Sequence, residues 1–183
     1  MSLHKQKLRL VIITGASSGI GLATAKLFAK RGYPLVLLAR RLEIMEALHL
    51  PHILCKAVDV TDRAGLIEAV KQAESLYGAA DVIINNAGVM LLGDMTNQNP
   101  DEWDRMLEVN VKGLLNGIHA VAGSMVKRQH GTIIKAGYED WKKNMGASVL
   151  SPEDVARAIF YAYEQPQGVC IREIVLASTR QQA

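Results

Sequence analysis

Short apolar runs recur along the first three quarters of the chain, each bounded by glycine or polar residues. The runs are rich in valine, isoleucine and leucine, a pattern typical of strands that are buried on both faces of a parallel sheet. We expect such strands at residues 8–15, 34–39, 53–60, 81–88 and 132–135. Strands of this kind require helices on both sides of the sheet to cover them.

Stretches with helical periodicity separate these runs. Apolar residues recur there at three- and four-residue spacing, as on the buried face of an amphipathic helix. We expect helices at residues 19–32, 42–48, 62–77 and 101–129, the last of them one long helix or two. Gly32 suits the end of the first helix, and Asp62 suits the cap of the third. The alternation predicts an α/β fold, a doubly wound parallel sheet with helices on both faces.

The alternation changes near the end of the sequence. Residues 137–146, GYEDWKKNMG, match neither pattern. A further helix is expected at residues 151–165 with Ser151 as its N-cap, and an apolar run at 171–177 is expected to form the last strand. No long linker, repeat or low-complexity segment interrupts the sequence, so residues 1–183 are expected to form a single domain.

Composition and charge exclude several classes of protein. Hydrophobic residues make up 49% of the chain and the net charge is only +3, with scattered basic residues, which argues against nucleic-acid binding. Cys55 and Cys170 are far apart, as expected in a reducing compartment. His49 and His52 have no thiol or carboxylate to complete a metal site. Because no apolar run reaches membrane-spanning length and the first residues lack an apolar signal core, we expect a cytoplasmic protein.

The loop 14-TGASSGIG-21 joins the first expected strand to the first expected helix. Its glycines, Gly15, Gly19 and Gly21, permit a tight turn and close approach of a ligand to the backbone. The start of the helix offers free N–H groups and a partial positive charge, which suit a pyrophosphate. A glycine-rich loop at this place, between a buried strand and a helix, indicates a dinucleotide site.

Four motifs in order resemble those of the short-chain dehydrogenase/reductase family. The glycine spacing at residues 14–21 differs from the usual dinucleotide fingerprint and is similar to that of this family. Residues 85–88, NNAG, resemble its motif after the fourth strand, and residues 59–60 match its adenine-contact position. Asn110, within EVNVKG, matches the helix asparagine of its catalytic tetrad. On these motifs the chain is identified as a member of the family.

The resemblance implies a Rossmann-like sheet that binds a dinucleotide across the carboxyl ends of its strands. It assigns cofactor binding to a set of loop and strand-end residues: Gly15, Ser17, Ser18, Gly19, Ile20, Gly21, Arg40, Arg41, Asp59, Val60, Asn86, Ala87 and Gly88. It assigns a catalytic role to Asn110, as the support of a bound water. The alternative is that Asn110 is a structural residue at a helix kink, since a buried asparagine must be hydrogen-bonded in any case.

The end of the second expected strand bears on the choice of cofactor. Enzymes that prefer NAD place an acidic residue there to bind the ribose hydroxyl, whereas this chain has Ala39 followed by Arg40 and Arg41. A guanidinium can bind the 2′-phosphate of NADP through two charge-assisted bonds, and Ser17 and Ser18 could add hydroxyl donors. NADP, as NADPH, is therefore expected rather than NAD. The alternative is that both arginines are solvated surface charges.

Tyr138 and Lys142 have the spacing of the family's catalytic Tyr-x-x-x-Lys pair, but their setting differs. The family tyrosine follows a serine and a loop, whereas Tyr138 lies four residues after Ile134 with no serine or threonine between them. Glu139 and Asp140 lie between the pair and would oppose phenolate formation. We therefore interpret this stretch as the later substrate-side segment of the family.

A block that would carry the serine, the tyrosine helix and the sixth strand is absent between Ile134 and about Lys135, at the end of the fifth expected strand. Two strand–helix units amount to about 60 residues. Either this sequence omits residues that the molecule contains, or the chain is truly shortened. We favour the first explanation, because the last strand at residues 171–177 would otherwise lack a neighbour for its backbone hydrogen bonds.

The function expected from the resemblance is that of an NADP-dependent oxidoreductase. It would transfer a hydride between the nicotinamide and a small secondary alcohol or carbonyl compound, a hydroxy acid or an aldehyde by the likeness of its last residues, 171-IREIVLASTRQQ-182. The alternative, for a truly shortened chain, is a catalytically inactive dinucleotide-binding module. The resemblance also implies a homodimer or homotetramer that associates through the helix at residues 112–129.

Overall fold

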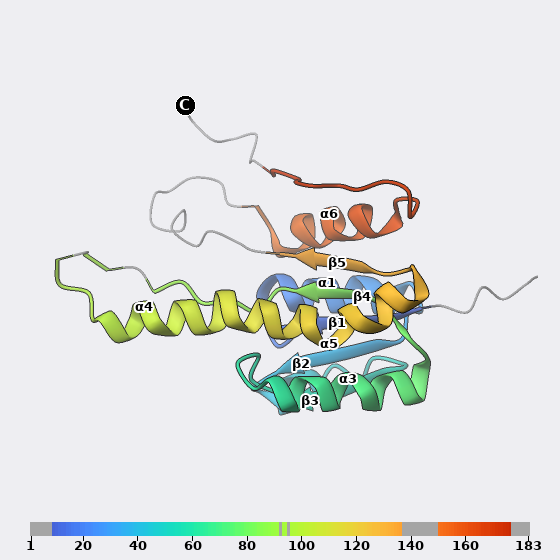
Figure 1. Cartoon of the computed structure of the whole chain (residues 1–183), viewed down its shortest axis with the longest axis horizontal. Coiled ribbons are helices and arrows are strands. Elements are labelled where there is room, and N and C mark those ends of the chain that lie inside the picture. The colour runs from blue at the N-terminus through green and yellow to red at the C-terminus, as the bar shows by residue number, and fades with distance from the viewer. Residues whose placement is uncertain (1–8, 92, 95, 137–149, 177–183) are drawn as a thin grey trace, which may run out of the picture.

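A parallel sheet of five strands, in the order β3-β2-β1-β4-β5, forms the centre of the computed structural model. The structure describes residues 9–91, 93–94, 96–136 and 150–176. The strands are β1 (Leu10–Thr14), β2 (Leu35–Ala39), β3 (Ile53–Ala57), β4 (Ala80–Asn85) and β5 (Thr132–Lys135). Every residue of β1, β2 and β4 is buried, as expected of continuous apolar runs in the middle of a parallel sheet. Figure 1 shows the strands side by side, from β3 at one edge to β5 at the other.

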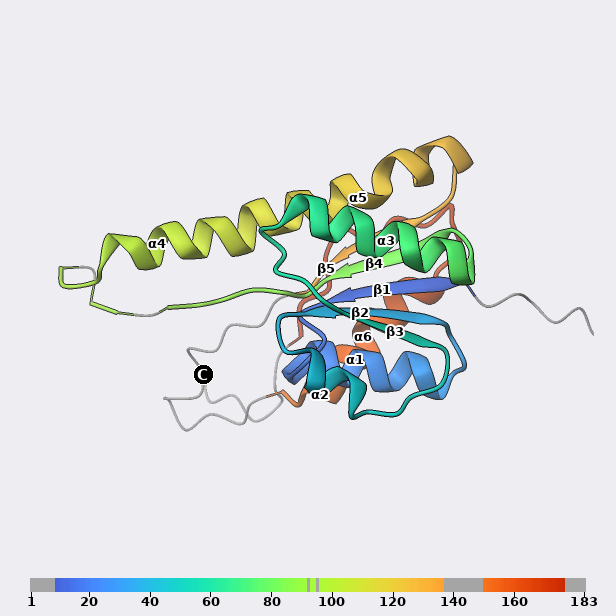
Figure 2. The ribbon, with the colours of Figure 1, turned by 90° about the horizontal axis from the view of Figure 1, so that it is seen from below.

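Helices cover both faces of the sheet, so the predicted doubly wound α/β fold is confirmed (Figure 2). They are α1 (Gly19–Lys30), α2 (Leu42–Glu46), α3 (Arg63–Tyr77), α4 (Pro100–Leu107), the π-helical turn η1 (Glu108–Lys112), α5 (Gly113–Arg128) and α6 (Pro152–Glu164). One apolar cluster joins the sheet to α1 and α6, and a second joins it to α3 and α5. None of the helices in the described residues is long and apolar enough to span a membrane.

The helix ends follow the local signals in the sequence. Asp62 caps α3 by accepting a hydrogen bond from the Gly65 N–H at 3.0 Å. Gly32 follows α1 with φ 83°, a left-handed conformation that glycine adopts without strain. Ser151 and Asp154 form a reciprocal capping box at the start of α6. The starts of α1 and α6 lie with the carboxyl ends of the strands at one edge of the sheet.

A polar cluster around the buried Asp81 joins α6 to the sheet at the opposite edge. The Tyr163 hydroxyl donates to the Asp81 carboxylate of β4 at 2.8 Å, and Arg9 and His130 contact the other carboxylate oxygen at 3.2 and 2.6 Å. Burial, followed by the contact with Asp81, raises the pKa of Tyr163. The phenol therefore remains protonated and keeps its role as the donor.

The prediction of a last strand at residues 171–177 is wrong for residues 171–176, which the structure describes. Residues 171–176 form no strand, and residue 177 lies outside the described residues. In the described part of the chain β5 pairs only with β4, and the apolar side chain of Val175 is 78% exposed. Figure 1 shows this segment running past β5, on the far side of α6. Without an adjacent strand to bond its N–H and C=O groups, an apolar segment does not become a strand.

Candidate cofactor-binding site

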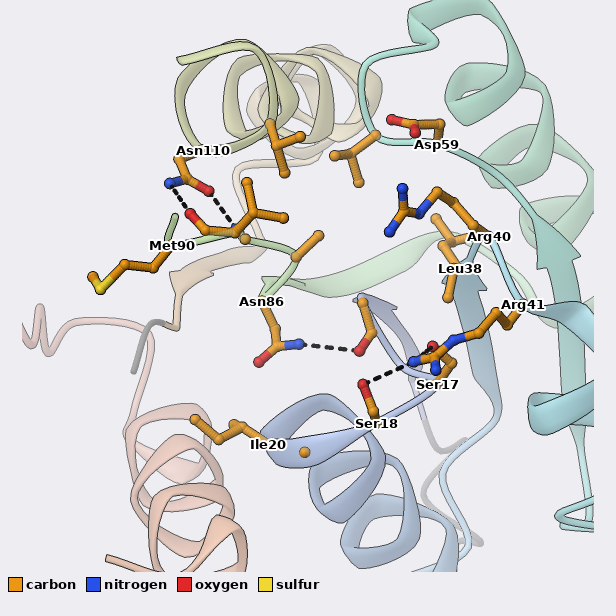
Figure 3. Close-up of a pocket in the computed structure, with 18 of the residues that line it drawn as sticks. Ser17, Ser18, Ile20, Leu38, Arg40, Arg41, Asp59, Asn86, Met90 and Asn110 are labelled. Carbon is orange, nitrogen blue, oxygen red and sulfur yellow. Dashed lines mark hydrogen bonds between the residues drawn. The ribbon is translucent and has the colours of Figure 1, made fainter. Parts of the chain in front are cut away.

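A cavity of about 1040 Å³ lies at the carboxyl edge of the sheet. Its walls come from the loop after β1, the residues that follow β2, β3, β4 and β5, the turn η1 and the start of α6. Figure 3 shows the labelled side chains around it. All the binding residues predicted from the sequence line this cavity except Gly21, and so does Asn110. The fold thus brings the predicted residues together from five separate segments of the chain.

The glycine loop closes one side of the cavity and carries the start of α1. Gly15 and Gly19 have φ values of 66° and 53°, in the left-handed region that favours glycine. A side chain on Gly19 would meet nothing within 4 Å, so a ligand can approach the backbone there. Ser18, the N-cap of α1, makes no side-chain cap bond, which leaves the first N–H groups of the helix for a ligand.

Gly21 does not line the cavity, and it packs against the glycine loop instead. A Cβ atom on Gly21 would lie 2.3 Å from the Gly15 carbonyl oxygen and 2.5 Å from the Asn86 amide nitrogen. Neither neighbour can move away without disturbing the loop. Gly21 is therefore needed for the close packing of α1 against the loop rather than for contact with a ligand.

Thr14 and Asn86 join the glycine loop to the segment after β4. The Thr14 hydroxyl accepts hydrogen bonds from the N–H groups of Asn86 and Ala87, both at 3.0 Å. In return, the Asn86 side chain donates to the carbonyl oxygens of Thr14 and Gly15 at 3.0 and 3.2 Å. The predicted NNAG motif thus holds the loop in shape, with Thr14 as a partner that sequence reasoning had not assigned.

The Arg41 side chain lies against the Ser17–Ser18 part of the glycine loop. Its guanidinium donates to the hydroxyls of Ser17 and Ser18, both at 3.1 Å (Figure 3). Ala39, at the end of β2, brings no carboxylate to this wall. A guanidinium and two hydroxyls together form a set of donors that suits a phosphate group.

Asp59 and Arg40 lie close together on the same side of the cavity (Figure 3). The Asp59 carboxylate accepts from the N–H and hydroxyl of Thr61 at 2.9 and 2.8 Å. Chiefly these bonds, with smaller contributions from Arg40 and Arg105, hold the pKa of Asp59 below its usual value although partial burial opposes this. Because β3 ends at Ala57, Asp59 belongs to the turn after the strand and not, as predicted, to the strand itself.

Asn110 joins the turn η1 to the segment after β4. Its side-chain oxygen accepts from the Val89 N–H at 2.8 Å, and its amide donates to the Val89 carbonyl at 2.7 Å. Turns of this π-helical kind recur at functional sites. The bonds fit the structural alternative for Asn110, while its catalytic role stays a prediction. Tyr138 and Lys142 lie outside the described residues.

Some wall residues were not predicted as site residues, and Lys135 is the charged one among them. The additional lining residues are Leu38, Ala39, Val58, Val89, Met90, Val109, Lys135, Leu150, Pro152 and Val155. Ala39 and Val109 lie in stretches that the sequence analysis used, and for the others the signal was position, since ligands in open α/β sheets bind outside the carboxyl ends of the strands. Partial burial lowers the pKa of the Lys135 ammonium. In the described ranges no three His, Cys, Asp or Glu side chains gather as metal ligands.

The sequence matches the short chain dehydrogenase family over residues 9–145. The chain belongs to this family. An uncharacterized oxidoreductase of Listeria monocytogenes is 42% identical over 134 residues, which cover 70% of this chain and 54% of the relative. The family member described here therefore spans about half the length of that relative.

A longer alignment relates this short-chain dehydrogenase to an uncharacterized oxidoreductase of Staphylococcus aureus strain MW2. The two are 29% identical over 222 residues, covering 92% of this chain and 96% of the relative. Because 222 exceeds the 183 residues of this chain by 39, the relative has at least that many residues without a counterpart here.

A solved structure of the same fold is the alcohol dehydrogenase from the archaeon Thermococcus sibiricus, complexed with 5-hydroxy-NADP. It aligns with a TM-score of 0.80 at 20% identity, over 96% of this chain and 99% of that one. At this identity the likeness supports the arrangement of the sheet and helices alone.

Proposed function

We propose that this protein is an NADP-dependent oxidoreductase that transfers a hydride between the nicotinamide and a small secondary alcohol or carbonyl compound. The observation that carries the proposal is the cavity that runs from the Arg41, Ser17 and Ser18 donors to the end of β5. Family membership and the names of the relatives, which are oxidoreductases, support the class of reaction. The Arg41 guanidinium beside the Ser17 and Ser18 hydroxyls, with Ala39 in place of an acidic residue at the end of β2, supports the choice of cofactor.

The strand order suits a dinucleotide that lies across the sheet. Arg41 follows β2 and Lys135 ends β5, and these strands are separated by β1 and β4. Three strand spacings amount to about 14 Å, which an extended dinucleotide can bridge. In this arrangement Arg41 would hold the 2′-phosphate and the start of α1 would hold the pyrophosphate, which leaves the end of the cavity at β4 and β5 for the nicotinamide.

The residues of the cavity fit this cofactor by position and by chemistry. When bound, the nicotinamide supplies the hydride-transferring carbon. Arg41 and the two serines hold the phosphate, and the uncapped N–H groups of α1 bind the pyrophosphate. Asn110 holds the segment after β4 in place beside the reactive end. Apolar side chains such as Val89 and Val155 exclude water from that end.

A second function, that of a catalytically inactive dinucleotide-binding module, is favoured by the length comparison. The Staphylococcus relative has at least 39 residues with no counterpart in this chain, counting 222 against 183. A shortened family member could retain the binding cavity without the serine and tyrosine that transfer the proton.

The proposal extends to the organisation of the protein. Residues 1–183 are proposed to form one domain. The protein is proposed to lie in the cytoplasm and to act as a homodimer or homotetramer.

Two measurements on the purified chain separate these functions. NADPH and NADH are titrated with the protein while their fluorescence is followed, and NADPH oxidation is then measured with a panel of small aldehydes, ketones and oxo acids. Tighter binding of NADPH together with turnover of a carbonyl compound is the result expected of the enzyme. Binding without turnover identifies the inactive module, and failure to bind either nucleotide contradicts both functions.

A further inference from the structure

The charged side chains of the cavity are distributed unevenly between its two ends. Among the described lining residues the ionisable ones are Arg40, Arg41, Asp59 and Lys135. The first three follow β2 and β3, whereas Lys135 closes β5 at the other edge of the sheet. The cavity thus has a cation at the end where the proposed cofactor would present its nicotinamide.

The backbone of Lys135 is held firmly at this place. Lys135 lies opposite Asn85 in the parallel pairing of β5 with β4. The next residue continues the pairing, since the Ala136 N–H donates to the Asn85 carbonyl at 3.0 Å. The backbone at this position belongs to the sheet and not to a loop. The Cα atom of Lys135 therefore has a fixed place at the cavity wall, from which the side chain extends.

The ammonium of Lys135 makes one hydrogen bond among the described residues. Its Nζ donates to the Ala136 carbonyl oxygen at 2.7 Å. An ammonium has three N–H donors, so two remain for water or a ligand. No carboxylate of the described residues pairs with it. Although the side chain as a whole is exposed, the ammonium lies partly out of water, which lowers the pKa of Lys135.

The neighbouring walls of this end are mostly apolar. The lining residues that follow β4 and lead into α6 are Val89, Met90, Leu150 and Val155, with Asn110 engaged by the Val89 backbone. In such surroundings an ion pair or charge-assisted bond is stronger than in bulk water. A neutral substrate would leave the two remaining donors to water, whereas a carboxylate could accept both of them.

We propose that Lys135 binds the carboxylate of the substrate, so that the preferred substrates are small oxo acids or the corresponding hydroxy acids. The inference rests on the proposed function, because it places the nicotinamide beside β5. The phosphates of the cofactor are not the partner of Lys135, since Arg41 and the start of α1 bind them over β2 and β1. The bond is electrostatic and involves no covalent step.

The experiment compares acids with neutral isosteres. The probes are pyruvate, acetoacetate and 4-oxopentanoate, each with its methyl ester, titrated by calorimetry into protein loaded with NADP. The acids are expected to bind about tenfold to hundredfold more tightly than the esters, the range of a charge-assisted hydrogen bond. The three chain lengths also report how far the carboxylate lies from the carbonyl group.

Variants test whether Lys135 causes the preference for acids over esters. Lys135→Met is expected to abolish the difference between acid and ester, and Lys135→Arg to retain part of it. Lys71→Met, on the exposed side of α3 and outside the cavity, should behave as the wild type. The acid affinity of the wild type should also fall as pH rises through the lowered pKa of Lys135, below the usual 10.5, and that of Lys135→Arg should not.

The outcomes distinguish this inference from the proposed function. Equal binding of acids and esters by the wild type, or an unchanged preference in Lys135→Met, overturns the role of Lys135 even if NADPH binds and is oxidised. Failure of all three acids to bind overturns it as well. If NADP does not bind but the unloaded protein still prefers acids through Lys135, the anion site stands and the cofactor assignment fails.

Discussion

At the scale of single residues, Arg41 is the side chain expected to discriminate between the two nicotinamide cofactors. Its guanidinium already contacts the Ser17 and Ser18 hydroxyls. Arg41→Met removes the charge-assisted bonds to a 2′-phosphate, so we expect NADPH affinity to fall about tenfold to hundredfold. NADH lacks that phosphate, and its affinity should change little.

Fluorescence titration of the Arg41 variant with both nucleotides measures this effect. Lys26→Met is a suitable control, because Lys26 is exposed on α1 and does not line the cavity. It removes one positive charge from α1 without touching the donors. An equal loss of NADPH and NADH affinity in Arg41→Met would mean that the arginine maintains the shape of the glycine loop and does not bind the 2′-phosphate.

The residues of the candidate site differed in how far the sequence revealed them. Gly15 and Gly19 were predictable because a tight turn and a close ligand approach demand glycine, and the structure gives both a left-handed φ. The contacts of Thr14 and Asn110 were not, because bonds from a side chain to a distant backbone depend on three-dimensional placement. Lys135 had no motif, and only the strand order shows which end of the cavity it occupies.

At the scale of elements, the attachment of α6 depends on a buried hydrogen bond. Tyr163→Phe leaves one oxygen of the buried Asp81 carboxylate without its donor. We expect a loss of about 1–3 kcal/mol in the free energy of unfolding, measured by urea denaturation. Tyr161→Phe, on the same helix but 58% exposed, should change it by less than about 0.5 kcal/mol.

The pH dependence of this bond follows from the raised pKa of Tyr163. A group whose pKa is higher in the folded state stabilises the fold fully below its unfolded pKa, about 10 for tyrosine. The difference in unfolding free energy between wild type and Tyr163→Phe should therefore be constant below about pH 10 and shrink above it. A difference that shrinks already near neutral pH would mean that the phenol of Tyr163 is not the group responsible.

The elements also show where pattern alone fails. The five predicted strands formed because each apolar run has a neighbour to bond with, although their ends shifted by a few residues. Residues 171–176 carry a similar apolar pattern, yet they form no strand. Strand propensity describes how side chains fit a pleated surface, and it cannot supply the adjacent backbone. The end of a sheet is therefore less predictable than its centre.

At the scale of the whole molecule, the outer side of α4 and α5 is the surface best suited to self-association. Leu107, Val111, Leu115 and Val126 are all exposed, with Leu115 at 57% and Val126 at 76%. The turn η1 joins α4 to α5 in one continuous helix, and the spacing of the four residues places them on one side of it. Exposed apolar patches of this kind typically mark contacts between proteins.

We expect light scattering to give a mass of two or four times the 20.0 kDa of one chain. Leu115→Glu places a charge at the centre of the apolar row, and desolvating it in an interface is costly. The variant should therefore elute at the mass of one chain and keep its affinity for NADPH, since Leu115 does not line the cavity. Leu76→Glu, 63% exposed on α3, should leave the assembly unchanged. If Leu115→Glu remains assembled while Leu76→Glu dissociates, the interface lies over α3, and the expected association through α5 is wrong.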